Sequence, residues 1–206
     1  YQVESVSDVL LVKDSYIIPN PEERGWVRLL SENHIFFDET LMGGLMKKDL
    51  GRYKDAFDTY RETLNVKEDV DFFLSIIREM LRKGRAEEVC EFISEYDDVY
   101  GKYYSVWEIR GNAEYSLEHY NRALDCYTKA TSLNPGDSVL WHSKGMSEEV
   151  LGLFEEAEAS YDRAIIIDLE NVDYWISKSA VQEKRGDIKN AIDSINKVIK
   201  YSPENV

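Results

Sequence analysis

The three histidines are the residues of this chain best suited to acid–base catalysis or metal binding. A metal site or a base–nucleophile pair needs several suitable groups at a short, regular spacing. His34, His119 and His142 stand far apart, and none has a partner at such a spacing. The histidines therefore predict neither a metal site nor a catalytic pair, and we expect His119 to be an exposed polar residue at a turn.

A second candidate is the segment 42–48, whose sequence is Met-Gly-Gly-Leu-Met-Lys-Lys. It contains two glycines and two lysines, but their spacing differs from that of a phosphate-binding loop. We interpret the glycines as positions of close helix packing. The acidic residues are spread along the chain, where such charges usually serve solvation. The sequence thus predicts a protein that is not an enzyme and that carries no metal ion or cofactor.

The two cysteines, Cys90 and Cys126, are too few for a disulfide framework. Both fall where small apolar residues pack, so we expect buried, reduced thiols. No apolar run is long enough to span a bilayer, and no secretory signal is visible. These features predict a cytoplasmic protein. Because the chain begins with Tyr1 rather than Met, we allow for a leader or a further domain ahead of it.

The chain is strongly acidic, with 40 Asp and Glu residues against 25 Lys and Arg residues and a net charge of −15. This charge repels phosphate backbones and anionic lipid surfaces, and no basic patch opposes it. We therefore predict no binding to nucleic acid or to membranes. Hydrophobic residues make up 43% of the chain, which is enough for a continuous core.

One arrangement of residues recurs twice at an interval of 34 residues, and it defines the elements that position the other side chains. A fixed period of this length indicates stacked structural repeats. The first copy consists of Trp107, Gly111, Tyr120, Ala123, Tyr127, Ala130 and Pro135. The second copy consists of Trp141, Gly145, Phe154, Ala157, Tyr161, Ala164 and Leu169. The third copy consists of Trp175, Ser179, Ile188, Ala191, Ile195, Val198 and Pro203.

Each copy predicts a pair of antiparallel helices. Gly152 and Gly186 mark the turn between the two helices, because a positive φ is easiest for glycine. Glu118 takes this place in the first copy, so we expect a turn of different construction there. The recurring alanines are expected where the two helices cross, and Tyr127 and Tyr161 are expected to fill the gap to the next unit.

The predicted fold is all-α, an α-solenoid of stacked antiparallel helix pairs. Weaker copies of the pattern extend the array toward the N-terminus, with Phe73 at the position that later holds tryptophan. The array covers residues 37–206, and its repeat units lie near residues 37–69, 70–103, 104–137, 138–171 and 172–206.

Residues 1–36 precede the array and are harder to interpret. The apolar stretch 9–12 is so short that its pattern fits a helix or a strand. Pro21, followed by two glutamates, fits the first turn of a helix. We interpret residues 1–36 as a lead-in of roughly two helices.

The spacing Trp-x3-Gly-x8-aromatic-x2-Ala-x3-Tyr-x2-Ala-x4-Pro resembles the tetratricopeptide repeat. The resemblance is strong over residues 104–206 and weaker over the two preceding units. It implies a right-handed superhelix of helix pairs with a concave groove that is lined by the first helix of each unit. It also implies a scaffold or adaptor that holds a peptide or helix of a partner protein in this groove.

The repeat frame predicts which first-helix residues face the groove. They mix apolar, aromatic and charged side chains, and their glutamates favour a partner with Lys or Arg. The alternative is a solvated helix face without a ligand. The predicted groove residues are Arg78, Glu108, Asn112, Tyr115, His142, Met146, Glu149, Ile176 and Glu183.

One subgroup of the family grips acidic C-terminal tails of chaperones through a clamp of Lys, Asn and Arg. Only the asparagine of this clamp is present, because the best-matching positions hold Glu108, Asn112, Ser143, Asp173 and Ser177. The carboxylates of Glu108 and Asp173 would repel a carboxylate ligand at short range. We therefore do not expect binding to chaperone tails.

Two functions remain open. The chain is either an adaptor whose groove binds a partner protein, or a regulatory or targeting module of a larger polypeptide, for which an enzyme is one option. Residues 203–206 fit the end of one unit and the start of another, and no polar capping helix follows. The apolar side chains of the last helix, including Ile192 and Ile195, then predict self-association.

Overall fold

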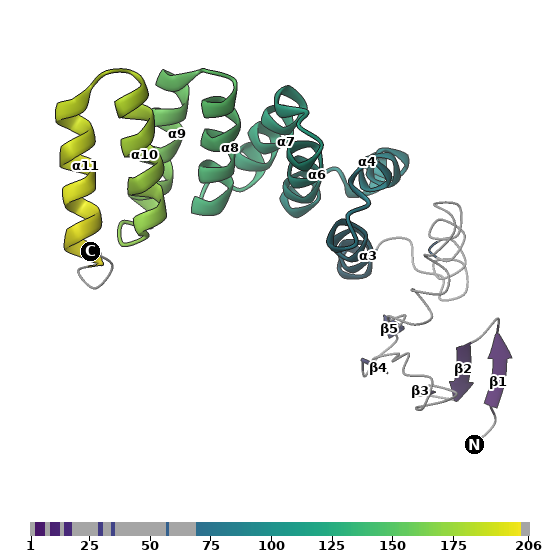
Figure 1. Cartoon of the computed structure of the whole chain (residues 1–206). Coiled ribbons are helices and arrows are strands. Elements are labelled where there is room, and N and C mark those ends of the chain that lie inside the picture. The colour runs from purple at the N-terminus through teal and green to yellow at the C-terminus, as the bar shows by residue number, and fades with distance from the viewer. Residues whose placement is uncertain are drawn as a thin grey trace. The chain divides into compact units, whose positions relative to one another are not determined.

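The computed structural model (Figure 1) describes residues 3–6, 9–12, 15–17, 29–30, 34–35, 57 and 69–202. The chain divides into two compact parts, Tyr1–Ile76 and Ile77–Val206. The division falls within helix α3 (Val70–Arg82), so the three strong copies of the repeat all belong to the second part.

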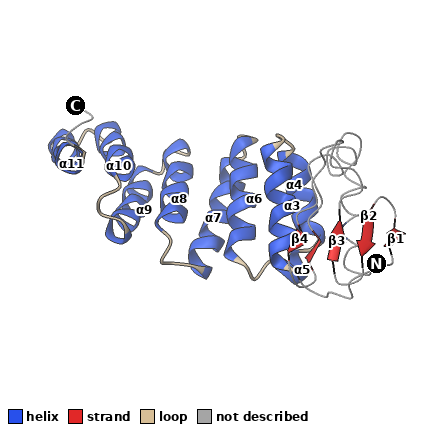
Figure 2. Cartoon of the chain, turned by 90° about the horizontal axis from the view of Figure 1, so that it is seen from below, coloured by secondary structure: helices blue, strands red, loops and turns tan. Residues whose placement is uncertain are grey.

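The second part is a row of helices that pack in the order of the sequence (Figures 1 and 2). Helix α4 (Ala86–Glu95) and the short α5 (Asp97–Tyr100) precede three helix pairs. The pairs are α6 (Tyr104–Ser116) with α7 (Tyr120–Leu133), α8 (Ser138–Val150) with α9 (Phe154–Ile167), and α10 (Val172–Lys184) with α11 (Ile188–Tyr201). Contacts between pairs run from α7 to α8 and from α9 to α10. The prediction of an α-solenoid of stacked helix pairs is confirmed.

The starts of the helices follow from local sequence. The first helices α3, α6, α8 and α10 begin 34 residues apart. Asp137 caps α8, because its Oδ1 accepts a hydrogen bond from the N–H of Val139 at 3.0 Å. Asn171 caps α10 in the same way, accepting from the N–H of Asp173 at 3.1 Å. Such caps satisfy N–H groups that have no partner inside the helix.

Short strands, rather than helices, form the described part of residues 1–36, so the prediction of a helical lead-in is wrong there. Strands β1 (Val3–Val6), β2 (Val9–Val12) and β3 (Ser15–Ile17) form an antiparallel sheet in the order β1-β2-β3, with Val3 opposite Val12 and Leu10 opposite Ile17. Strands β4 (Leu29–Leu30) and β5 (His34–Ile35) form a second antiparallel pair.

The physical reason lies in the length and type of these apolar runs. A run of about four residues is far too short to form a stable helix in water. Valine and isoleucine, which recur in these runs, lose less side-chain freedom in a strand than in a helix. The residues between β3 and β4, including Pro21, lie outside the described residues.

The predicted repeat unit 37–69 also lies outside the described residues, apart from Phe57 and Asp69. Phe57 is helical and fully buried. Its ring stacks on that of Phe72 at a centroid distance of 5.7 Å and lies 5.6 Å from that of Phe73. Phe73, at the position of the later tryptophans, is therefore part of an aromatic cluster. Pro203 is likewise outside the described residues.

In two repeat units, a tyrosine of the second helix lies directly on a glycine of the first. A Cβ atom placed on Gly111 would come within 2.7 Å of the Tyr127 ring, and one on Gly145 within 2.6 Å of the Tyr161 ring. No real side chain tolerates such distances, so both positions require glycine. The tyrosines were expected to fill the gap to the next unit. Both rings lie on the glycine of their own pair, and Tyr161 also belongs to a buried cluster with Val181 of α10, the next unit.

The equivalent positions of the other units show the same constraint. In α10 the glycine is replaced by Ser179, and the tyrosine on α11 becomes the smaller Ile195. In the unit of α3 and α4 the two positions hold Ile77 and Ile93, and both are buried. A larger residue on the first helix therefore goes with a smaller one on the second, as close packing demands.

The three repeated tryptophans tie each first helix to the loop that precedes it. The indole N–H donates to the carbonyl of the residue six positions earlier in every case. The distances are 2.6 Å from Trp107 Nε1 to Gly101 O, 2.9 Å from Trp141 to Pro135 O and 2.9 Å from Trp175 to Leu169 O. The tryptophans thereby hold the loops that connect successive units.

The turns inside the helix pairs share one backbone conformation. Gly84, Gly152 and Gly186 have φ values of 74°, 77° and 79°, and Glu118 has a φ of 61°. The expectation of a different turn at Glu118 is therefore wrong, because this glutamate itself adopts the left-handed conformation.

The hydrogen bonds of these turns also follow one pattern. In each turn, two N–H groups after the first helix return to carbonyls of its last turn, as in a Schellman motif. The bonds run from Gly152 to Glu149 and from Leu153 to Glu148 in one turn, and from Glu118 to Tyr115 and from His119 to Glu114 in the other. The hydrogen-bond pattern is strong enough to hold a glutamate where glycine is the usual residue.

Replacing Glu118 with glycine should stabilise the protein. A left-handed conformation costs a residue with a Cβ atom about 1–2 kcal/mol, whereas the freedom of glycine in the unfolded chain costs about 0.5–1 kcal/mol. We expect Glu118→Gly to raise the free energy of unfolding in urea by about 0.5–1 kcal/mol.

Gly152→Ala is the matched control, since a Cβ atom there meets nothing within 4 Å and only the backbone conformation is penalised. This substitution should lower the free energy of unfolding by about 1 kcal/mol. A destabilised Glu118→Gly variant would contradict the positive φ at this turn.

Candidate functional site

The predicted groove residues lie on the first helices α3, α6, α8 and α10. They occupy three equivalent positions of the repeat: Glu108, His142 and Ile176; Arg78, Asn112 and Met146; and Tyr115, Glu149 and Glu183. Arg78, Asn112, Ile176 and Glu183 are exposed, and the other five are half-buried. All nine side chains are therefore partly accessible, but several have partners within the chain.

Asn112 is held by the second helix of its own unit. Its Oδ1 accepts a hydrogen bond from Tyr127 Oη at 2.7 Å. Burial raises the pKa of Tyr127, so this hydroxyl remains a donor. An asparagine side chain can hold a peptide backbone with both its donor and its acceptor. The acceptor of Asn112 is engaged inside the helix pair, which leaves the amide N–H groups for a partner.

Glu149 is engaged on both carboxylate oxygens. Its Oε2 accepts from Tyr161 Oη at 2.7 Å, and its Oε1 accepts from Lys184 Nζ at 2.7 Å. Burial, followed by the hydrogen bond to Glu149, raises the pKa of Tyr161. Because Lys184 belongs to α10, the carboxylate links two consecutive units. Its charge is largely neutralised and adds little attraction for a basic partner.

His142 links α8 to α10. Its Nε2 lies 2.9 Å from Ser177 Oγ, and its ring lies 4.9 Å from that of Tyr174 and 5.4 Å from that of Tyr161. Burial lowers the pKa of His142, although the charges of Asp173 and Glu149 act in the opposite direction. The imidazole is therefore neutral at pH 7.

A serine and a histidine at this distance could act as nucleophile and base. Ser177, however, lies inside α10, where the backbone N–H groups are bonded to helix carbonyls. An acyl-transfer site needs such groups to be available for the developing oxyanion. The pair is better explained as a polar link between two repeat units.

Glu108 is the half-buried acidic residue of α6. Burial raises its pKa, the charge of Asp137 raises it further, and the charge of Arg78 lowers it. Glu108 therefore ionises less readily than an exposed glutamate. Glu183 adds an exposed carboxylate to the same face.

The sequence did not point to a second set of polar residues, which are buried between the helices of each pair. Glu114, Glu148 and Gln182 occupy one repeat position on the first helices, and all three are buried. Their partners are His119 Nδ1, 2.9 Å from Glu114 Oε2; Ser160 Oγ, 2.6 Å from Glu148 Oε2; and Ser194 Oγ, 2.8 Å from Gln182 Oε1. The recurrence of polar residues at 34-residue spacing was the signal that could have revealed them.

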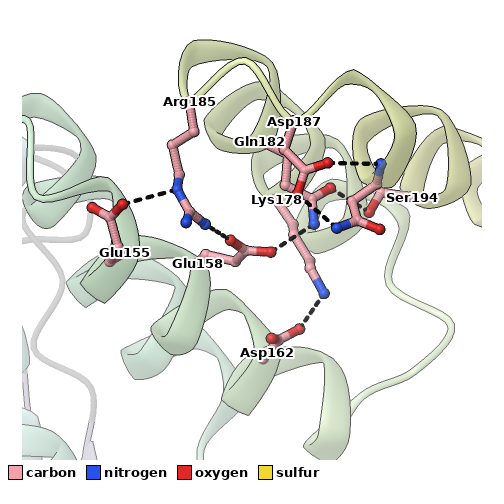
Figure 3. A network of polar contacts seen from close by, with 9 residues as sticks. Glu155, Glu158, Asp162, Lys178, Gln182, Arg185, Asp187 and Ser194 are labelled. Atoms are coloured by element: carbon pink, nitrogen blue, oxygen red, sulfur yellow. Dashed lines mark hydrogen bonds and ion pairs between the residues drawn. The ribbon is translucent and has the colours of Figure 1, made fainter.

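A polar network joins α9 to α10 (Figure 3). The acidic members belong to α9, and the cationic members are Lys178 of α10 and Arg185, which follows the last residue of α10. Gln182 Nε2 donates to Glu158 Oε1 at 2.6 Å, Arg185 pairs with Glu158 and, at 3.1 Å, with Glu155, and Lys178 Nζ lies 2.5 Å from Asp162 Oδ1. Charge complementarity therefore helps to align these two repeat units.

The thiols and other metal-ligand residues offer no reactive centre in the described part of the chain. Burial raises the pKa of Cys90 to about 12 and that of Cys126 to about 11, so both thiols are protonated at neutral pH. Among the described residues, no group of three or more His, Cys, Asp or Glu side chains could hold a metal ion. No helix in this part is long and apolar enough to cross a membrane.

Comparison with known families agrees with this geometry. The sequence model of the tetratricopeptide repeat matches residues 104–137, which contain α6 and α7. A second such model matches residues 172–205, which contain α10 and α11. The chain is a tetratricopeptide-repeat protein. No curated protein sequence matches it.

Solved structures of MamA share the fold of this tetratricopeptide-repeat protein. One crystal structure of MamA aligns with a TM-score of 0.65 at 17% identity and covers 75% of this chain and 91% of that one. Another aligns with a TM-score of 0.65 at 16% identity, over 77% and 86%. The "41-end" form of MamA from Desulfovibrio magneticus RS-1 aligns with a TM-score of 0.64 at 14% identity, over 75% and 84%.

At these identities the likeness to MamA shows the fold alone. Tetratricopeptide repeats and related helical arrays present extended surfaces for binding other proteins. The broad functional class is therefore a protein-interaction module.

The position of His142 predicts that the tetratricopeptide repeats lose stability in mild acid. Burial lowers the pKa of His142 below its ordinary value of 6.5, so the unfolded chain binds more protons once the pH falls below 6.5. The contribution of His142 is present above that pH and is lost as the pH falls through the lowered pKa. Urea denaturation from about pH 7.5 to about pH 5 should show a smaller loss for His142→Gln than for the unaltered protein. Equal losses would show that His142 is not the titrating group.

Proposed function

We propose that this chain is a non-catalytic scaffold that holds a segment of a partner protein against the first helices α6, α8 and α10. The supporting observation is a run of accessible apolar side chains on successive first helices. Tyr115 and Met146 are half-buried, and Ile176 is 46% exposed. An exposed isoleucine on a first helix offers a partner apolar contact area that the repeats themselves do not use.

The chemistry of this face suggests a role for each accessible group. Tyr115 and Ile176 supply apolar area, and the flexible side chain of Met146 adapts to different partners. The amide N–H groups of Asn112 can donate to a carbonyl of the bound segment. The exposed carboxylate of Glu183 favours a lysine or arginine in the partner.

Ion pairs within the chain determine how far electrostatic attraction can contribute to partner recognition. Glu149 is already paired with Lys184, whereas the carboxylate of Glu183 is exposed. The partner is therefore selected mainly by apolar contact, with a contribution from Glu183. Since exposed charge pairs are screened by salt, we propose only a modest weakening of binding at high ionic strength. We also propose a cytoplasmic setting, which agrees with the two free, protonated thiols.

Peptides selected from a random display library on the purified chain provide the test. Ile176→Glu should weaken the binding of the selected peptides at least about tenfold, because a charge replaces an exposed apolar contact of the proposed site. Ile176 is partly exposed, so helicity measured by circular dichroism should not change.

Ile166→Glu on α9 is the matched control, since it places the same charge on an isoleucine that is 74% exposed on a second helix. Peptides that are lost from Ile166→Glu but retained by Ile176→Glu would place the site on the second helices and overturn the proposal. Failure to select any peptide would also count against it.

A further inference from the structure

Helix α11 carries four accessible isoleucines along one side. Their exposed fractions are 53% for Ile188, 56% for Ile192, 41% for Ile195 and 43% for Ile199. Their spacing of four, three and four residues places them on one face of the helix. Figure 1 shows α11 at the end of the row of paired helices. We refer to these four residues as the α11 stripe.

The equivalent face of α9 shows what such a surface contacts inside the array. Tyr161 and Ile165 of α9 correspond to Ile195 and Ile199, but they are only 0% and 5% exposed. Helix α10 covers this face of α9: Tyr161 lies in a buried cluster with Val181, and Ile165 lies in a second cluster with Tyr174. The α11 stripe is therefore a helix-binding surface that no described helix covers.

The charges beside the stripe differ from those on α9. Glu155, Glu158 and Asp162 of α9 pair with Lys178 of α10 and with Arg185 at its C-terminal end (Figure 3). The equivalent residues of α11, 34 positions later, are Lys189, Ile192 and Asn196. The carboxylates are thus replaced by a cation, an apolar side chain and an amide.

A helix with the charges of α10 would not suit this surface, because its arginine would meet Lys189. Lys200 adds a second cation on the same side of α11 as Lys189, since the two are three helical turns apart, and Asp193 lies between them on that side. The α11 stripe therefore calls for a helix with apolar residues opposite Ile192 and acidic residues opposite the two lysines.

We propose that the α11 stripe binds an amphipathic helix of a partner protein whose apolar face is flanked by Asp or Glu. This site is separate from the first-helix site proposed above and uses none of its residues. The partner is recognised by apolar burial on the isoleucines and by opposite charge at Lys189 and Lys200.

A second copy of the chain fits less well, although the sequence suggested self-association. Helix α11 carries Lys189, Lys197 and Lys200 against Asp193, which gives it a charge of 3 − 1 = +2. Two α11 helices that paired through their stripes would bring charges of the same sign together. An anionic membrane attracts basic amphipathic helices, but the net charge of −15 on the whole chain opposes that approach.

The test uses two synthetic helical peptides with the same leucine stripe, one flanked by glutamate and the other by lysine. Fluorescence anisotropy with the full chain measures their affinities. The glutamate peptide should bind at least about tenfold more tightly, even though the protein as a whole is acidic. Ile192→Glu should weaken it at least about tenfold, whereas the control Val150→Glu, at a residue 50% exposed on α8, should not.

A charge-swap variant distinguishes recognition by charge from non-specific hydrophobic binding. The double variant Lys189→Glu and Lys200→Glu should prefer the lysine peptide. Equal affinities for both peptides, or no effect of Ile192→Glu, would overturn the proposal.

Two further measurements distinguish the other occupants. If sedimentation equilibrium detects a dimer and Ile192→Glu dissociates it, a second copy of the chain covers the α11 stripe. Binding to phosphatidylserine vesicles that Ile192→Glu abolishes would show that a membrane does. Either result would overturn the proposal, which predicts a monomer and no vesicle binding through α11.

Discussion

The packing of a tyrosine ring directly on a glycine is the contact on which two helix pairs of this protein depend, α6 with α7 and α8 with α9. The Tyr127 ring leaves no room for a Cβ atom on Gly111, and the Tyr161 ring leaves none on Gly145. This close approach also brings the tyrosine hydroxyls to first-helix side chains, where Tyr127 meets Asn112. Packing and polar bonding within each pair therefore arise from the same fit.

This arrangement explains which side chains remain for partners. The first helices carry polar residues along the predicted groove, but the second helices and the next unit engage several of them. Asn112 accepts from Tyr127, and Glu149 accepts from Tyr161 and Lys184. The accessible remainder is apolar at Ile176 and, at the end of the row, along α11. Partner binding is thus expected where the repeats leave apolar area uncovered.

The 34-residue spacing was sufficient to predict the helix pairs from residue 104 onward. The same packing contacts recur in each pair, so similar residue types recur in the sequence. The spacing could not show that Glu118 adopts a positive φ, since the hydrogen bonds of the turn impose that conformation on a residue that disfavours it. Nor could it show the bond between His142 and Ser177, which depends on how two units meet. The strand Val9–Val12 was not predicted, because a run of four apolar residues is too short to distinguish the period of a strand from that of a helix.

The most direct measurement is the free energy of unfolding of Gly145→Ala compared with that of Ser179→Ala. Alanine normally favours a helix over glycine, by about 1 kcal/mol. The clash with the Tyr161 ring should nevertheless make Gly145→Ala less stable by about 1–3 kcal/mol. Ser179 stands at the same repeat position opposite the smaller Ile195, so Ser179→Ala should change stability by less than about 0.5 kcal/mol. A Gly145→Ala variant as stable as the unaltered protein would contradict the account.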